Sequence, residues 1–410
     1  MRTIFFFLCT MMLHLTAQAQ PNDLVYQLLK NAKLHSLDTV LQNADKYEVQ
    51  IVYTQINRDK KNRPTFNTFT YRHLPNQYFY PASTVKLPTA VFALCFLNQE
   101  KIQAQQMLKI KELHTQNYEV ENDSSAQNYE ASIAHYVHKN FVVSDNDAYC
   151  RLFELTGQAY LQQNLAKYGY KNTKILRRFK VVAPNGNQFA NAFDFFDAKG
   201  NITHKIPERF NDFLYKNTLE GCKKGVGYYK DDSLVHEPMD FLQSNCFPVM
   251  EQHRFLKELM FVKEQKMPLP LTANDYKLLY KSMHLLPRQS SIKSYADTTE
   301  YYDGYCKFFM YGNSKNAVIP DNILIFNKVG EAYGTLTDNA YVVDTLHGVE
   351  FLLTATIYVN DDQIFNDDNY EYDSIGYPFL EDVGSVIYAH ELARVKKNKP
   401  NFDGLLEFLK

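Results

Sequence analysis

The pattern of hydrophobic and polar positions predicts β-strands near both ends of the chain and helices between them. Five runs are rich in β-branched and aromatic residues: 47–56, 65–71, 322–328, 340–344 and 349–359. The first two runs flank the polar stretch 57–62, which predicts a β-hairpin. Strands therefore come from the two ends of the chain, and we expect them to meet in one sheet.

Helical periodicity is strongest in the middle of the chain and at its end. Apolar residues with a period near 3.6 predict helices over 23–43, 83–97, 132–140, 147–168, 272–286 and 376–394. The stretch 185–267 mixes Gly, Asn, Lys and aromatic residues without a sustained period, so it predicts loops and short helices, and it has the character of an insertion. The combined pattern predicts an α+β fold, with a sheet flanked by helices and a separate helical lobe.

The first nineteen residues have the pattern of an export signal. Met1-Arg2 is a short positive start, residues 4–15 are mostly apolar, and Ala17-Gln18-Ala19 is a small-x-small cleavage site. A membrane anchor is the weaker interpretation, because the apolar run is too short to cross a bilayer. We therefore expect residues 1–19 to be removed and 20–410 to form a single domain, exported to the periplasm or the extracellular space.

Composition excludes several classes of function. Lys plus Arg (44) nearly balance Asp plus Glu (46), so there is no basic field for nucleic acid. The twelve histidines show no zinc-ligand spacing and no Gly-rich phosphate loop is present, so no metal and no cofactor is expected. No segment after the signal is long and apolar enough to span a membrane. We expect a monomer.

Cysteine usage fits an exported protein only in part. Loss of the signal removes Cys9 and leaves five cysteines, so at least one thiol is unpaired. Cys222 and Cys246 are the expected pair in an oxidising compartment. Cys95 and Cys150 lie in apolar helical patterns and are expected in the core.

Ser83 and Lys86 are the first candidates for chemistry. If Ser83 opens a helix, Lys86 lies three residues on along the same face, and its amine can reach the serine hydroxyl. A serine hydroxyl needs such a base to become a nucleophile. A serine before a helix is also a common N-cap, so the pair alone does not decide between the two interpretations.

Two later motifs add polar groups of the same kind. Ser144-Asp145-Asn146 joins two predicted helices, where it could be N-cap material or could place Ser144 as a proton relay and Asn146 on a substrate amide. Lys328-Val329-Gly330 ends an apolar strand. It could be an ordinary strand end, or it could hold the ammonium near a substrate carboxylate, with Gly330 allowing close approach.

In this order, Ser83-x-x-Lys86, Ser144-Asp145-Asn146 and Lys328-x-Gly330 resemble the penicillin-recognising serine enzymes, and in particular the class A β-lactamase-like family. The resemblance covers roughly 23–394. It implies the β-lactamase/DD-peptidase-like fold, whose antiparallel sheet is built from both chain ends, and a substrate that is a β-lactam or derives from peptidoglycan.

The resemblance also implies a role for each site residue. Ser83 would be acylated with Lys86 as the base, and Ser144 would pass the proton to the leaving nitrogen. Asn146 would bind the acyl side-chain amide and Lys328 the substrate carboxylate. The backbone N–H groups of Ser83 and of Glu331, which follows Gly330, would form the oxyanion hole.

The sequence departs from the family pattern at two points, and the second concerns hydrolysis of the acyl-enzyme. Val329 stands where the family has threonine, and no glutamate occurs between Glu154 and Glu208 to activate the deacylating water. Asp197, four residues before Asn201, and Glu208 are weak substitutes. The alternatives to a β-lactamase are therefore a penicillin-binding, DD-peptidase-like enzyme with slow deacylation, or a non-catalytic cell-wall or ligand-binding relative.

Overall fold

The computed structural model of the chain describes residues 24–111, 119–126, 128–180 and 185–410. The predicted export signal, residues 1–19, lies outside these ranges. Within them, no helix has both the length and the apolar character needed to cross a membrane.

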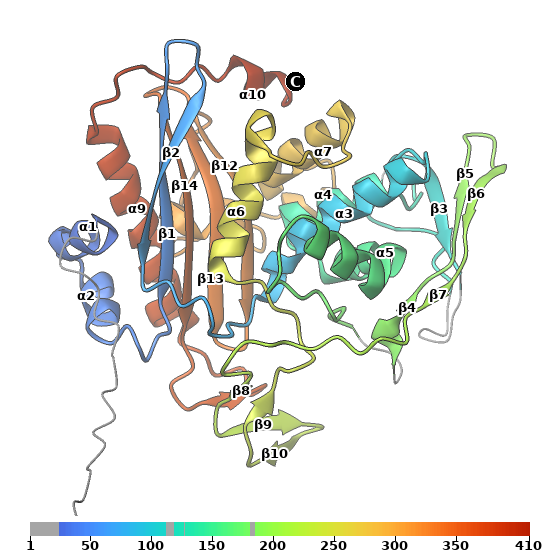
Figure 1. Ribbon diagram of the computed structural model, residues 1–410, viewed down its shortest axis with the longest axis horizontal. Coiled ribbons are helices and arrows are strands. Elements are labelled where there is room, and N and C mark those ends of the chain that lie inside the picture. Colours follow the sequence, from blue (N-terminus) through green and yellow to red (C-terminus); the bar gives the residue numbers. More distant parts are fainter. Residues whose placement is uncertain (1–23, 112–118, 127, 181–184) are drawn as a thin grey trace, which may run out of the picture.

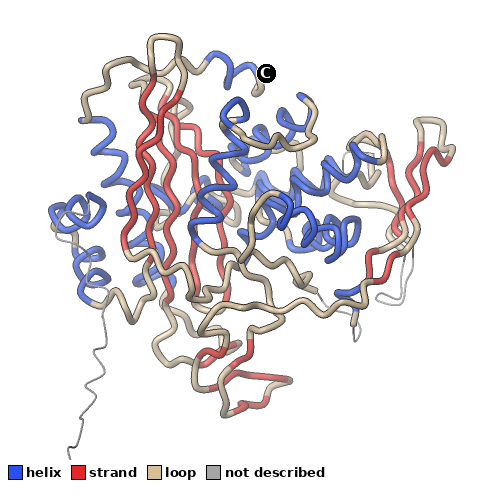
Figure 2. The backbone as a smooth tube through the Cα atoms, in the orientation of Figure 1, coloured by secondary structure: helices blue, strands red, loops and turns tan. Residues whose placement is uncertain are grey.

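A five-stranded antiparallel sheet forms the centre of the molecule (Figures 1 and 2). Its order is β12 (Ile323–Ala332), β13 (Thr335–Asp344), β14 (Val349–Tyr358), β1 (Gln50–Arg58) and β2 (Pro64–Tyr71). The two chain ends meet where β1 pairs with β14, with Ile51 opposite Ala355. Strands β13 and β14 are buried along their whole length, because helices cover both faces of the sheet. The predicted sheet from both chain ends and the predicted hairpin are confirmed.

The helices are α1 (Leu24–Ala32), α2 (His35–Gln42), α3 (Lys86–Gln99), α4 (Ile133–Val142), α5 (Asn146–Lys167), α6 (Val249–Met260), α7 (Ala273–His284), α8 (Phe308–Tyr311), α9 (Tyr377–Ala393) and α10 (Asp403–Glu407). Helices α1, α2 and α9 cover one face of the sheet, and α6 covers the other (Figure 1). Helices α3, α4 and α5 form the predicted helical lobe, and α7 joins it to the sheet by packing on both α4 and β12. The fold is α+β, as the sequence predicts.

Two hydrophobic cores correspond to these two sides. One joins the sheet to α1, α2 and α9 and includes Ile51, Phe351 and Ile387. The other joins the opposite face of the sheet to the lobe and includes Phe326 and Phe92. Helix α3 is buried around almost its whole circumference, which makes it the central helix of the lobe. Its first residue is therefore held firmly in place.

The helix expected over 23–43 is instead two helices, α1 and α2. Lys33 between them has a φ of 54°, and the left-handed conformation ends α1. The leucine pattern continues across the break because both helices pack against α9. Periodicity alone could not show where the chain turns.

The stretch 185–267 differs from the expected loops and short helices. It forms short strands, namely β4 (Phe189–Ala190), β5 (Phe193–Phe196), β6 (Ile202–Ile206), β7 (Arg209–Phe210), β8 (Lys223–Lys224), β9 (Gly227–Lys230), β10 (Ser233–Val235) and β11 (Met239–Asp240). Beyond the stretch, β3 (Met107–Ile110) pairs with β5, and β15 (Ile364–Phe365) pairs with β9. The stretch ends in α6, which packs against β1, β13 and β14. Its last part therefore belongs to the central fold.

The predicted pair of Cys222 and Cys246 is wrong. All five cysteines of the described chain are free and buried. Cys222 and Cys246 lie in one aromatic cluster with Phe241, where the Cys222 thiol donates to the carbonyl of Leu219 (3.3 Å). Cys95 and Cys150 are core residues, as predicted.

Candidate active site

Ser83 lies in a tight turn at the start of the central helix. The 3₁₀ turn Ala82–Val85 leads directly into α3, whose first residue is Lys86. Ala82 has a φ of 45°, a strained conformation of the kind that gathers at functional sites. The Ser83 side chain caps neither helix, and within the described residues its hydroxyl forms no hydrogen bond. The N-cap interpretation is therefore wrong, and the hydroxyl is left facing a cavity.

Lys86 is fully buried and turned towards the loop between α4 and α5. Its Nζ donates to Asn146 Oδ1 (2.7 Å), to Ser144 Oγ (3.1 Å) and to the Ser144 carbonyl. Burial lowers the pKa of Lys86 well below its ordinary value, and the nearby charge of Lys328 lowers it further. A lowered pKa makes it easier for this amine to give up a proton and then to accept one from a neighbouring group.

Three residues at the turn between α4 and α5 have different roles. Asp145 is the N-cap of α5, because its side chain accepts a hydrogen bond from the Ala148 N–H (2.7 Å). Ser144 has a φ of 58°, and its hydroxyl and the Asn146 amide both point to Lys86. The capping interpretation thus holds for Asp145, and it leaves Ser144 and Asn146 for the site.

Lys328 reaches the same serine from the opposite side. It lies on β12, is almost fully buried, and donates to Ser144 Oγ (2.8 Å) and to the Val329 carbonyl (2.8 Å). Burial lowers the pKa of Lys328 to about 8. Ser144 Oγ therefore stands between two lysine amines, a geometry suited to passing a proton.

Gly330 allows β12 to touch the Ser83 turn. A β-carbon on Gly330 would lie 2.6 Å from the Pro81 carbonyl oxygen and 3.2 Å from the Ser83 backbone nitrogen. Only glycine fits such an approach. Strand β12 is an edge strand of the sheet, and Glu331, the next residue along it, lines the cavity. The structure thus brings all seven predicted site residues together around one place.

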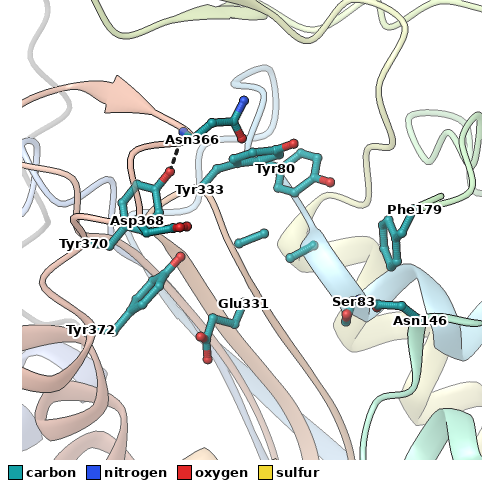
Figure 3. A pocket seen from close by; sticks show the side chains of 12 residues that line it. Tyr80, Ser83, Asn146, Phe179, Glu331, Tyr333, Asn366, Asp368, Tyr370 and Tyr372 are labelled. Atoms are coloured by element: carbon teal, nitrogen blue, oxygen red, sulfur yellow. Dashed lines mark hydrogen bonds between the residues drawn. The ribbon is translucent and has the colours of Figure 1, made fainter. Parts of the chain in front are cut away.

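A cavity of about 440 Å³ opens in front of Ser83 (Figure 3). Ser83, Asn146 and Phe179 lie on one side, and Tyr370, Asp368 and Tyr372 lie on the other (Figure 3). The remaining lining residues are Tyr80, Ala82, Glu331, Ala332, Tyr333 and Asn366. The aromatic lining was not predicted. Tyr80 and Tyr333 lie three residues from Ser83 and Gly330, which is the one signal that could have indicated them.

Phe179 covers Lys86 on the side of the cavity. Lys86 Nζ lies 5.2 Å from the centre of the Phe179 ring, which also packs on Tyr149 (4.5 Å between ring centres). The neighbouring Arg178 holds this loop on α5 through Glu154 (2.8 Å), which is buried and also receives Arg151 (2.9 Å). An apolar ring, fixed by a buried ion-pair network, therefore faces the candidate base.

The two weak candidates for a water-activating carboxylate lie elsewhere. Asp197 shapes the turn between β5 and β6, where its Oδ1 accepts from the N–H groups of Lys199 (2.9 Å) and Asn201 (2.9 Å). Neither Asp197 nor Glu208 lines the cavity in the described part of the chain. The suggestion that Asp197 activates water is wrong, because its carboxylate serves the turn. No group of three or more potential metal ligands occurs among the described residues.

Comparison with known families agrees with the motifs. Residues 34–208 match the Beta-lactamase enzyme family. The matched range contains Ser83, Lys86, Ser144 and Asn146 and ends before Lys328. This match agrees with the β-lactamase-like resemblance that the motifs predict.

Solved structures give the same kind of likeness at low identity. A β-lactamase from Burkholderia phymatum is 11% identical, with 90% of this chain and 100% of that chain covered and a TM-score of 0.48. A β-lactamase from Chitinophaga pinensis is 13% identical, with 89% and 97% covered and a TM-score of 0.45. An ancestral class A β-lactamase is 14% identical, with 89% and 100% covered and a TM-score of 0.45. No curated protein matches the chain.

Proposed function

We propose that this β-lactamase-like protein is an exported serine hydrolase that is acylated on Ser83 by β-lactams or related amide and peptide substrates and releases the acyl group slowly. The observation that carries the proposal is the chain of contacts from Lys86 through Ser144 to Lys328, next to a serine hydroxyl that faces the cavity.

The acylation step follows from these contacts. Ser83 Oγ attacks the substrate carbonyl carbon and gives its proton to neutral Lys86. The backbone N–H groups of Ser83 and Glu331 stabilise the oxyanion that forms. The carbon–nitrogen bond then breaks, and the leaving nitrogen takes a proton from Ser144, which is replenished from Lys86. Asn146 holds the acyl side-chain amide, and Lys328 attracts the substrate carboxylate.

Release of the acyl group needs a water molecule and a base to activate it. Phe179 occupies the cavity side of Lys86, and the carboxylates that line the cavity, Glu331 and Asp368, lie across it from Phe179 (Figure 3). Loss of a positioned general base typically slows a step by about 10²- to 10⁴-fold. The acyl-enzyme is therefore long-lived, which favours a penicillin-binding, DD-peptidase-like enzyme over an efficient β-lactamase.

Labelling with a fluorescent penicillin tests the proposal. The purified protein is expected to gain a covalent label that survives denaturation, and Ser83→Ala is expected to gain none. Ser314→Ala, a change at an exposed serine outside the cavity, is the matched control and keeps the label. An unlabelled wild type, or equal labelling of Ser83→Ala, contradicts the proposal and favours the non-catalytic, ligand-binding alternative.

A further inference from the structure

The half of the cavity that faces Ser83 across the opening contains aromatic and acidic side chains for which acylation has no use. Tyr370, Asp368 and Tyr372 lie on this side, Tyr333 borders it next to Tyr80, and Glu331 lies between it and Ser83 (Figure 3). We call the five residues Tyr333, Tyr370, Tyr372, Glu331 and Asp368 the tyrosine wall. The inference below rests on the proposed acylation of Ser83, since it concerns the part of the substrate that extends away from the attacked carbonyl.

Tyr333 keeps its place in the wall at a conformational cost. It has a φ of 55° in the turn between β12 and β13, and Gly334 beside it has a φ of 74°. Asn is favoured over tyrosine at this position of such a turn. The Tyr333 ring packs on Tyr80 (5.0 Å between centres) and on Phe241 (5.9 Å). A strained turn thus presents an aromatic ring to the cavity.

The other two rings are fixed through their hydroxyl groups. The Tyr370 hydroxyl accepts from the Asn366 backbone N–H (2.9 Å, dashed in Figure 3), and the Tyr372 hydroxyl accepts from the Gly334 backbone N–H (2.8 Å). The two ring centres lie 5.3 Å apart. Their faces are therefore held in position before any ligand arrives.

The charges around the wall are almost all negative. Glu331 and Asp368 line the cavity, and no lysine, arginine or histidine of the described chain does so. The surrounding loop adds further carboxylates: Asp361, Asp362, Asp367, Glu371 and Asp373. In the described structure, the one ion pair of this loop joins Asp361 to Lys46 (2.8 Å). The wall is thus an acidic, aromatic surface; Arg177, whose positive charge acts on Tyr333, does not line the cavity.

The pKa values of two of these carboxyl groups are raised. Desolvation raises the pKa of Glu331, and the charge of Asp373 raises it further, against a hydrogen bond from Tyr377. Burial raises the pKa of Asp367, and the neighbouring Asp362 adds to the effect. A positive charge brought into the wall would relieve this repulsion.

We propose that the tyrosine wall binds a positively charged amine of the substrate, on the acyl side away from the carbonyl that Ser83 attacks. Glu331 and Asp368 attract the ammonium, and the fixed tyrosine faces hold it through cation–π contacts. With Lys328 attracting a carboxylate at the other end, the preferred substrate is zwitterionic: a β-lactam or a peptide that carries a free amine and a carboxylate.

Three penicillins that differ only at one carbon of the phenylacetyl side chain test this inference. Benzylpenicillin has hydrogen there, ampicillin an ammonium group and carbenicillin a carboxylate. The expected order of second-order acylation rates is ampicillin, benzylpenicillin, carbenicillin, with about tenfold between the first and the last. The preference is expected to shrink as ionic strength rises, because the groups lie near solvent.

The double variant Glu331→Gln/Asp368→Asn is expected to reduce the ampicillin-to-carbenicillin ratio to near one. Both carboxylates are exposed into the cavity, so their neutral amides keep the shape of the wall. Glu407→Gln, a change at an exposed carboxylate on α10, is the matched control and keeps the wild-type ratio.

The outcomes separate the two proposals. Equal rates for the three penicillins, or an unchanged ratio in the double variant, overturn the amine site and leave acylation intact. If none of the three acylates the protein, the proposed function fails. Calorimetric binding of the three compounds to Ser83→Ala then decides the amine site alone, since tighter binding of ampicillin supports it and equal or weaker binding overturns it.

Discussion

The two sides of the cavity are built on different principles. On the Ser83 side, Lys86 and Lys328 are buried, and their amines are committed to hydrogen bonds with Ser144 and Asn146. On the opposite side, the tyrosine wall presents ring faces and carboxylates that are exposed to the cavity. Buried, fully bonded groups can act at one position only, whereas exposed faces tolerate ligands of different shape.

This difference indicates where chemistry and selectivity reside. In the proposed reaction, the buried side fixes the positions of the atoms that attack and transfer protons, so changes there should alter rates for every substrate. The tyrosine wall touches only the distal part of a ligand, so changes there should alter the ratio between substrates. Phe179 lies on the buried side but supplies no proton-transfer group, and it should control release of the acyl group alone.

Replacement of the candidate base gives the largest expected effect. In Lys86→Met, acylation by benzylpenicillin should fall by about 10³-fold, because the buried amine that we propose as acceptor of the Ser83 proton is lost while its apolar stem is kept. The measurement is the rate of covalent labelling at saturating and subsaturating penicillin. Lys101→Met, a change at an exposed lysine beyond the end of α3, should retain the wild-type rate. Labelling of Lys86→Met at the wild-type rate would show that Lys86 is not the base.

A carboxylate in place of the Phe179 ring should speed release of the acyl group. Phe179→Glu places an acid next to Lys86 at the mouth of the cavity, and we expect deacylation to accelerate by about ten- to a hundredfold. The half-life of the penicilloyl adduct after removal of free penicillin is the measurement. Phe179→Gln has nearly the same size without the charge and should accelerate deacylation much less. Equal half-lives for the two variants would show that water activation is not what the wild type lacks.

The pKa of Lys328 predicts a pH dependence for anionic substrates. Lys328 is charged below about pH 8 and neutral above it, so attraction of a substrate carboxylate weakens as the pH rises through this value. At pH 9 about one tenth of the charged form remains, and kcat/KM for acylation by benzylpenicillin should fall by up to about tenfold relative to its methyl ester. The ratio to the ester cancels changes in Lys86, and a constant ratio between pH 7 and 9 would contradict the role of Lys328.

Tyr333→Asn should have the smallest effect and acts on selectivity only. Asparagine suits the left-handed conformation of the turn, so the backbone strain is relieved while the ring is removed from the wall. We expect the ampicillin-to-carbenicillin ratio to fall by about threefold. Thermal unfolding of the variant checks that the turn is retained. A ratio equal to that of the wild type would exclude the Tyr333 ring from amine recognition.

The same contrast explains how much could be predicted from the sequence. The proximity of Ser83, Lys86, Ser144 and Lys328 could be predicted because these residues occur in motifs of fixed order and local spacing. The sheet was found because β1 and β14 carry strong strand patterns. The placement of these motif residues and of these two strands depends on local geometry, which a short sequence pattern can predict.

Features that depend on long-range contact were missed. Tyr370 and Tyr372 reach the cavity only because the loop after β14 folds back over the turn at Gly334. The position of Phe179 depends on the ion pair between Arg178 and Glu154, 24 residues apart in the chain. The break at Lys33 and the free thiol of Cys222 likewise depend on packing that no short pattern records.

The intact mass of the protein after exposure to benzylpenicillin is the most direct test of the central claim. We predict one added penicillin per chain, mapped by proteolysis to the peptide that contains Ser83, and still present long after free penicillin is removed. A protein whose mass never changes, an adduct on a peptide without Ser83, or rapid return to the native mass would contradict slow release from a Ser83 acyl-enzyme.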